Sequence, residues 1–277
     1  EEVMAHRLED LPIVRIVVTH MHPDHIGLAH WLCERWQVPL YISGADYLHA
    51  RLGCGLTRGF GGDPARRFFA SHGVSEPAAL EAVGLHGPRY GDMVPKVPPQ
   101  YRRLLHGQVL SIGGHDWQCI VGHGHAPEHM ALYCAKQDLL ISGDMVLPRI
   151  STNVSVYESE PEGDPLGLFL ASIQRFVELP AHTQVLPSHG EPFVGLHTRV
   201  AQLSQHHQER LSELLNACRS SAPCAFEVLP VLFKRSLDHH QLAFAMGEAI
   251  AHLNHLWHQG LLVRHVDAQG IYRFSAH

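Results

Sequence analysis

The residues of this chain that are best suited to chemistry lie at positions 19–27, Thr-His-Met-His-Pro-Asp-His-Ile-Gly. His20 and His22 are two positions apart, so at the end of an extended strand both imidazoles point the same way and can bind one metal ion. The proline after them stops the strand pairing, and Asp24 and His25 follow on a turn, from which they can reach a second ion. The chain has 25 histidines, so one histidine means little, but four residues of these types at this spacing predict a metal site rather than a polar turn.

The segments on either side of this motif must position it. Residues 13–18 are apolar and mostly β-branched, which predicts a strand buried on both faces. Residues 28–36 repeat apolar side chains at helical spacing, and residues 39–42 predict a short strand. Strand, turn, helix and strand together predict a βαβ unit, with the metal ligands at the end of its first strand.

His-x-His-x-Asp-His after a hydrophobic strand resembles the signature of the metallo-β-lactamase fold hydrolases. Three later motifs resemble the family's elements in the same order. Residues 124–129, Gly-His-Ala-Pro-Glu-His, are similar to its Gly-His-Thr-Pro-Gly-His element. Residues 142–144, Ser-Gly-Asp, resemble the element with the bridging aspartate, and residues 187–190, Pro-Ser-His-Gly, resemble the element with the last histidine. The resemblance covers roughly residues 12 to 197.

The resemblance implies a set of ligands for two divalent metal ions. One ion is assigned to His20, His22 and His125, the other to Asp24, His25 and His189, and Asp144 bridges them. Zinc is the expected metal, although imidazole and carboxylate ligands also suit iron and manganese. A water held between two such ions loses a proton near neutral pH, and the resulting bridging hydroxide attacks a carbonyl or phosphoryl group. Asp24, which can orient that hydroxide, and Asp144 are the implied catalytic residues.

The resemblance also implies the fold class, which is α/β, an αββα sandwich. We expect a catalytic domain over residues 1–197 and a small helical, winged-helix-like C-terminal domain over residues 198–277. The C-terminal part predicts helices at 202–218 and 242–257 and a hairpin over 260–274. The alternative for this part is a helical cap that completes the core or a dimer contact, so a homo-oligomer stays open. His252, His255 and His258 are expected to be solvated polar residues, not ligands.

Residues 1–11 predict the end of a helix, although family members carry several strands before the first motif. We therefore expect additional N-terminal strands, on the order of fifty residues, to precede Glu1 in the full-length protein. Without them the first sheet would be short of strands.

The middle of the chain predicts the remaining elements. Residues 46–90 mix helical stretches with glycines, with Asp63 as a helix N-cap, and form either a wall of the pocket or a surface excursion. A hairpin over 108–121, strands at 131–134, 138–142 and 184–187 and a helix at 165–178 follow. Two further histidines, His123 and His129, could lie near the metals. Three other side chains could meet a substrate: Arg149, Asn153 and Tyr157.

Composition limits the remaining choices. The chain has 277 residues, of which 45% are hydrophobic, so it can bury a sizeable core. No apolar run approaches the roughly 18 residues that cross a membrane. Six scattered cysteines without a Cys-x-x-Cys pair indicate reduced thiols, and we expect a cytoplasmic protein. The net charge of −6 counts against a nucleic-acid substrate.

These observations lead to a dinuclear metal-dependent hydrolase whose small-molecule substrate is a thioester or ester of the hydroxyacylglutathione, acyl-CoA or lactone type. β-Lactamases of this fold generally carry cysteine or serine near the position of Asp144, whereas glyoxalase II, lactonases and nucleases of the fold carry aspartate. The first alternative is a single-strand endoribonuclease or other phosphodiesterase, suggested by the winged-helix-like part. The second is a non-catalytic metal-dependent binding protein.

Overall fold

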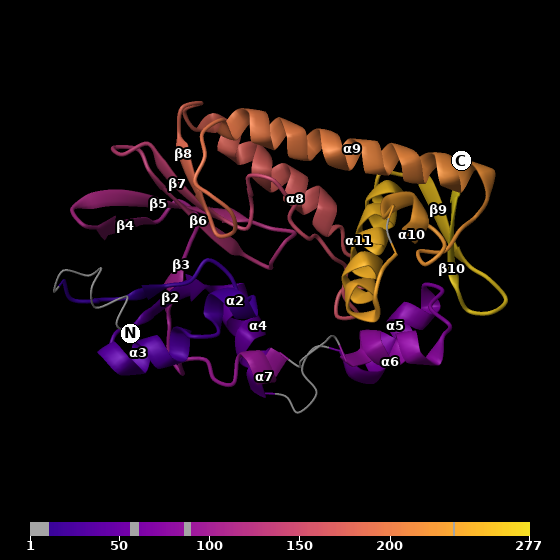
Figure 1. Ribbon diagram of the computed structural model, residues 1–277, viewed down its shortest axis with the longest axis horizontal. Helices are drawn as coiled ribbons and strands as arrows, with labels where there is room; N and C mark the ends of the chain where they lie inside the picture. The colour runs from indigo at the N-terminus through magenta and orange to yellow at the C-terminus, as the bar shows by residue number, and fades with distance from the viewer. Residues whose placement is uncertain (1–10, 56–60, 86–89, 235) are drawn as a thin grey trace.

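The computed structural model describes residues 11–55, 61–85, 90–234 and 236–277, and two β-sheets lie at its centre (Figure 1). The helix expected for residues 1–11 lies almost wholly outside the described residues. No described helix is both long enough and apolar enough to cross a lipid bilayer.

The smaller sheet is parallel and carries the first motif. It contains β1 (Ile16–Val17), β2 (Leu40–Ser43) and β3 (Arg102–Leu104), in that order, and α3 (Ala29–Trp36) connects the first two strands. The predicted βαβ unit is therefore confirmed. The first strand is shorter than expected and is not buried on both faces, since the side chain of Val14 is 60% exposed. The physical reason is that β1 is an edge strand, paired only with β2 among the described residues.

The larger sheet has five strands in sequential order. They are β4 (Val109–Ile112), β5 (His115–Gly122), β6 (His129–Cys134), β7 (Leu139–Gly143) and β8 (Gln184–Pro187). The first four pair antiparallel, and β7 pairs with β8 in parallel. The ends of β7 and β8 therefore lie at the same edge of the sheet, which places the residues that follow them side by side.

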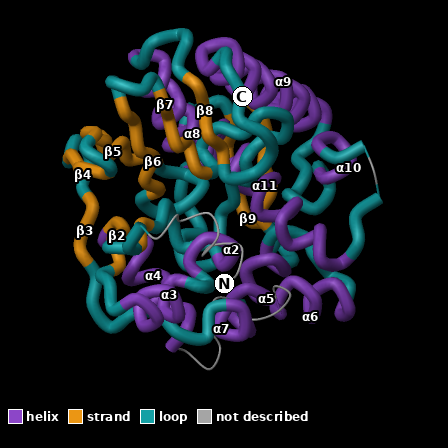
Figure 2. Tube along the Cα trace, turned by 60° about the vertical axis from the view of Figure 1, so that its left-hand side comes forward, coloured by secondary structure: helices purple, strands orange, loops and turns teal. Residues whose placement is uncertain are grey.

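Apolar side chains fill the space between the sheets and cover their outer faces. Leu104, Leu110, Trp117, Met130 and Leu132 form the layer between the sheets. Helices α3 and α4 (Gly44–Gly55) cover the outside of the smaller sheet, and α8 (Pro165–Gln174) and α9 (Leu196–Ser220) cover the larger one (Figure 2). The predicted αββα sandwich is confirmed.

The segment between β2 and β3 is helical and largely packed. It contains α4, α5 (Gly62–Ser71), α6 (Pro77–Leu85) and α7 (Tyr90–Met93), and buried side chains of α5 and α6 join the same apolar core as the C-terminal helices. These two helices are therefore packed into the fold, and whether the segment forms a wall of the pocket stays a prediction. The predicted cap is wrong: the N-cap of α5 is Gly61, so the helix begins two residues earlier than predicted, and Asp63 in its first turn pairs with Arg66 instead.

The C-terminal part follows the predicted order of helices and hairpin. After α8 come the 3₁₀ helix η1 (Arg175–Glu178), β8 and then the 25-residue α9. Next come α10 (Leu229–Leu232), α11 (His239–His258) and the antiparallel hairpin of β9 (Leu262–Val266) and β10 (Tyr272–Ala276). The domain boundary that we predict between residues 197 and 198 lies within α9 and stays a prediction.

Two of the three histidines at the end of α11, His252 and His255, are buried, contrary to the expectation for this helix. His252 is fully buried, and its Nδ1–H donates to the carbonyl oxygen of Glu248 at 2.8 Å. His252 Nε2 therefore accepts from Nδ1–H of His207 on α9, at 3.1 Å. His255 is also buried and contacts Asp164 at 3.0 Å. The prediction of solvated residues is wrong for His252 and His255, because one face of α11 packs into the core, and holds for His258, which is exposed.

The buried pair of His207 and His252 should make the stability of the fold depend on pH. Burial lowers the pKa of His207 to about 3 and of His252 to about 4, below the ordinary value of about 6.5 that they regain on unfolding. The unfolded chain therefore binds more protons between these values, and the free energy of unfolding falls as the pH decreases from 6.5 toward 4.

We expect the double variant His207→Leu, His252→Leu to lose part of this slope, up to roughly 1.4 kcal/mol per pH unit for each histidine. Chemical denaturation of the metal-loaded wild type and variant at pH 7.5, 6, 5 and 4 measures it. Equal slopes for the two proteins would show that the pair does not titrate on unfolding.

Candidate metal centre

All seven predicted ligands lie together where strands of both sheets end. His20 and His22 follow β1, Asp144 follows β7 and His189 follows β8, while His125 lies in the β5–β6 connection. The backbone N–H of Met130 at the start of β6 donates to the carbonyl oxygen of Thr19 at 2.7 Å, which ties the two sheets at this point. The side chains form three overlapping groups: His20, His22 and His125; His20, His25 and Asp144; and Asp24, His25 and His189.

The first group is a cluster of three imidazoles. Nε2 of His20 lies 3.0 Å from Nδ1 of His22 and 3.2 Å from Nε2 of His125. His20 is fully buried, and the side chain of His125 is only 6% exposed. Three ring nitrogens therefore converge on one point with little access to water, as the ligands of one metal ion do.

The second group is open to solvent. Oδ2 of Asp24 lies 3.3 Å from Nε2 of His25 and 3.2 Å from Nε2 of His189. The side chains of Asp24 and His189 are 55% and 46% exposed, whereas that of His25 is 12% exposed. The site is thus closed on the side of the three imidazoles and open on the side of Asp24 and His189, where a substrate can enter.

Asp144 lies between the two groups. Its Oδ2 is 3.4 Å from Nε2 of His125 and 3.5 Å from Nε2 of His189, and its Oδ1 is 3.5 Å from Nε2 of His25. Its carboxylate therefore faces histidines from both groups, as a bridging ligand must.

The donor atoms suit a cation. Burial lowers the pKa of His22 to about 3 and also lowers that of His20, so both rings are neutral and carry lone pairs. Burial raises the pKa of Asp144, but the facing His125 and His25 outweigh it, and the pKa lies well below its ordinary range. Nε2 of His25 and Oδ1 of Asp144 are buried without a hydrogen-bond partner. Neutral imidazoles and an ionised carboxylate directed at one another fit divalent metal ions.

Two ligand rings are oriented by bonds from their other nitrogen. His125 Nδ1–H donates to the carbonyl oxygen of Asn153 at 2.8 Å, which leaves Nε2 free for a metal. His20 Nδ1 lies 3.0 Å from the hydroxyl of Thr19, so Nε2 is again the free nitrogen. Of the two other predicted neighbours, the ring of His123 instead bonds the carbonyl oxygen of Pro127 at 2.7 Å and contacts no ligand.

His129, by contrast, supports the site directly. Its Nε2 accepts from the backbone N–H of Asp144 at 3.1 Å, and its ring centre lies 4.9 Å from that of His20. Gly143 makes this contact possible: its φ is +54°, and a Cβ there would lie 2.2 Å from Nε2 of His129. A side chain at position 143 would therefore displace the residue that holds Asp144.

Asp46 is a supporting residue that the sequence does not reveal. Its carboxylate is fully buried and accepts from the backbone N–H of Met21 and of Glu128, each at 2.7 Å. The hydroxyl of Tyr90 donates to the carbonyl oxygen of Met21 at 2.6 Å. Met21 stands between His20 and His22, so Asp46 ties that segment to the loop that carries His125. Ser43-x-x-Asp46 looks like an ordinary helix start, which conceals this role.

We expect Asp46→Asn to lower zinc affinity about 10- to 100-fold. The carboxylate of Asp46 accepts hydrogen bonds from two backbone N–H groups, and the amide nitrogen of asparagine cannot accept one of them. Competition with a chromophoric chelator measures the affinity. Asp116→Asn, an exposed carboxylate on β5, is the matched control and should bind zinc as the wild type does. Equal affinities for all three proteins would show that Asp46 does not position the ligands.

Comparison with known proteins identifies the family. The model of the metallo-β-lactamase superfamily matches residues 1–189, and a metallo-β-lactamase-like C-terminal domain matches residues 211–277. A β-lactamase domain protein from Burkholderia ambifaria is 46% identical, with a TM-score of 0.93 over 100% of this chain and 78% of that one. A metallo-β-lactamase family protein from Thermus thermophilus is 25% identical, with a TM-score of 0.77 over 100% and 85%. The probable metallo-hydrolase YqjP of Bacillus subtilis (strain 168) is 25% identical over 98% of this chain and 83% of that protein. The chain belongs to the metallo-β-lactamase superfamily.

Proposed function

We propose that this protein is a dinuclear metal-dependent hydrolase of small thioesters or esters. The observation that carries the proposal is the position of Asp144, whose carboxylate faces histidines of both ligand groups at 3.4 to 3.5 Å. The relative from Bacillus subtilis, named a probable metallo-hydrolase, supports the reaction class. Aspartate at this position favours thioesters, esters and lactones over β-lactams.

Each group of side chains has a role in this proposal. His20, His22 and His125 hold one ion, and Asp24, His25 and His189 hold the other, with zinc as the expected metal. Two such ions, when bound, activate a water near neutral pH and polarise the scissile carbonyl. The exposed carboxylate of Asp24 accepts a hydrogen bond from the attacking water and orients it. The buried imidazoles exclude bulk water from the closed side, so the substrate reaches the centre past Asp24 and His189.

We expect the zinc-loaded protein to contain two metal ions per chain and Asp144→Asn to retain about one. Hydrolysis of thioesters and esters by the variant should fall by about 100-fold or more, because the amide carries no charge to hold two cations together. Elemental analysis measures the metal content, and turnover of acyl-glutathione, acyl-CoA and lactone substrates measures activity. Asp138→Asn, at the opposite end of the same strand, is the matched control and should keep both properties.

The same assay separates this proposal from its alternatives. Single-stranded RNA and an aryl phosphodiester are added to the substrates. Cleavage of these two alone by the two-metal protein would indicate a phosphodiesterase. No turnover of any substrate by a fully metallated protein would contradict the hydrolase proposal and favour a metal-dependent binding protein.

A further inference from the structure

A cavity of about 340 Å³ lies between the loop that follows Asp144 and helix α9, and none of its lining residues belongs to the seven predicted ligands. One wall is formed by residues 149–151 of the loop that follows β7. The other wall is formed by Arg199, Gln202, Leu203 and His206 on the first half of α9. This cavity is therefore built from the loop that leaves Asp144 and from the helix on which that loop rests.

The lining is cationic although the protein as a whole is acidic. It contains Arg149 and Arg199 but no carboxylate, in a chain whose net charge is −6. The arginine ion pairs among the described residues involve other arginines, so neither of these two has an acidic partner. Two guanidinium groups without a protein anion favour an anionic ligand, because guanidinium matches carboxylate and phosphate geometry.

Arg199 is held in place by neutral acceptors. Its Nε donates to the carbonyl oxygen of Leu147 at 2.6 Å, and one terminal nitrogen donates to that of Ile150 at 2.9 Å. The other terminal nitrogen donates to the side chain of Gln202 at 3.2 Å. A guanidinium has five N–H groups, so two remain for a ligand. Because the side chain is already ordered, binding an anion costs little conformational entropy.

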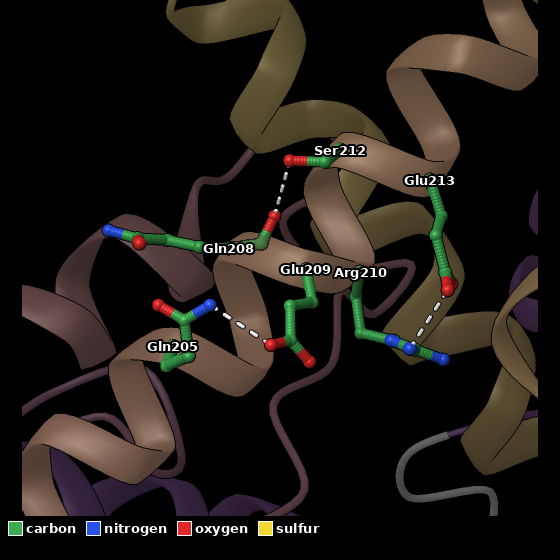
Figure 3. A pocket seen from close by; sticks show the side chains of 6 residues that line it. All are labelled: Gln205, Gln208, Glu209, Arg210, Ser212 and Glu213. Carbon is green, nitrogen blue, oxygen red and sulfur yellow. Dashed lines mark hydrogen bonds and ion pairs between the residues drawn. The ribbon is translucent and has the colours of Figure 1, made fainter.

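A neighbouring surface of the same helix shows the opposite arrangement. Gln205 donates to Glu209 at 2.9 Å, and Arg210 donates to Glu213 at 3.0 Å (Figure 3). Glu209 thus has a polar partner and Arg210 an oppositely charged partner on the same helix, although Nε of Arg210 itself has none. The arginines of the cavity differ because their charge is left without an opposite charge.

The loop that lines the cavity contacts the segment of His189. Gly190 follows His189, and a Cβ on Gly190 would lie 2.7 Å from Cγ of Pro148, so these two segments are in contact. Arg149, the first lining residue of the loop, directly follows Pro148. One wall of the cavity therefore begins next to the segment that carries His189, whose side chain is 46% exposed.

We propose that this cavity binds an oxyanion, a carboxylate or a phosphate, that the substrate carries away from its scissile ester or thioester bond. Arg149 and the two remaining N–H groups of Arg199 bind the oxyanion, and a ring N–H of His206 adds a donor. Ile150 and Leu203 contact the carbon chain between the anion and the scissile bond. This inference rests on the proposed function, since it names the class of substrate for the same metal centre.

Two pairs of substrates test it, and each pair shares its scissile bond. The first pair is a neutral aryl acetate and the aryl monoester of glutaric acid, which adds a carboxylate. The second is acetyl-pantetheine and acetyl-CoA, which adds phosphates. We expect the wild type to prefer the anionic member in one pair by kcat/KM, which identifies the anion as carboxylate or phosphate.

The expected result is that Arg149→Gln lowers this preference about tenfold, the effect of losing one hydrogen bond between charged groups. His206→Gln should lower it less. Arg219→Gln, an exposed arginine at the far end of α9 that donates to Asn216 at 3.1 Å, is the matched control and should keep the preference.

The outcomes separate the two proposals. Turnover without a preference for either anionic substrate, or an unchanged preference in Arg149→Gln, would overturn the anion site and leave the hydrolase intact. No turnover of these four substrates or of the acyl-glutathione, acyl-CoA and lactone substrates named above would overturn the proposed function instead. Calorimetry with glutarate and adenosine 3′,5′-bisphosphate then decides the site: binding that weakens in Arg149→Gln supports it, and absent or unchanged binding overturns it.

Discussion

The carboxylate of Asp144, nearly buried among imidazoles at the end of β7, is the constraint on which the rest of this structure depends. A buried carboxylate is unfavourable unless positive charge or hydrogen-bond donors face it, and three histidine rings face Asp144 at 3.4 to 3.5 Å. Divalent metal ions suit this arrangement, because a cation both neutralises a carboxylate and accepts histidine lone pairs. The binding of such ions is coupled to folding wherever a site is assembled only in the folded chain.

Holding such donors together requires a rigid support, and the support comes from backbone groups of three separate segments. Asp46 on α4 accepts from the chain next to His20 and from the loop that carries His125. His129 on β6 accepts from the backbone of Asp144, at a distance that only glycine at position 143 permits. The segments of His20, His125 and Asp144 are thus positioned by residues of α4 and β6, so the geometry depends on the packing of both sheets.

The sequence predicts those parts of the site that depend on the spacing of residues close together in the chain. The seven predicted ligands lie within short motifs at strand ends, so strand periodicity and family resemblance are enough to predict that these side chains lie together. Asp46 was missed because its partners, Met21 and Glu128, are distant in sequence and use backbone atoms, which no side-chain pattern records. The burial of His252 was missed for a related reason: it depends on contact with His207, which lies 45 residues earlier on another helix.

Helix α9 connects the metal centre to the C-terminal part of the chain. Its first turns cover the larger sheet, with Leu196, Val200 and Leu203 buried there, and its later turns pack against α10, α11 and β10. Arg199 on this helix binds the carbonyl oxygens of Leu147 and Ile150, in the loop that runs from Asp144 toward Asn153. The loop that begins at Asp144 and ends at Asn153, whose carbonyl oxygen accepts from the ring of His125, is therefore fixed by a helix whose other end is anchored in the C-terminal helices. The C-terminal part thereby helps to hold a loop that contacts two of the predicted ligands, without supplying any of the seven itself.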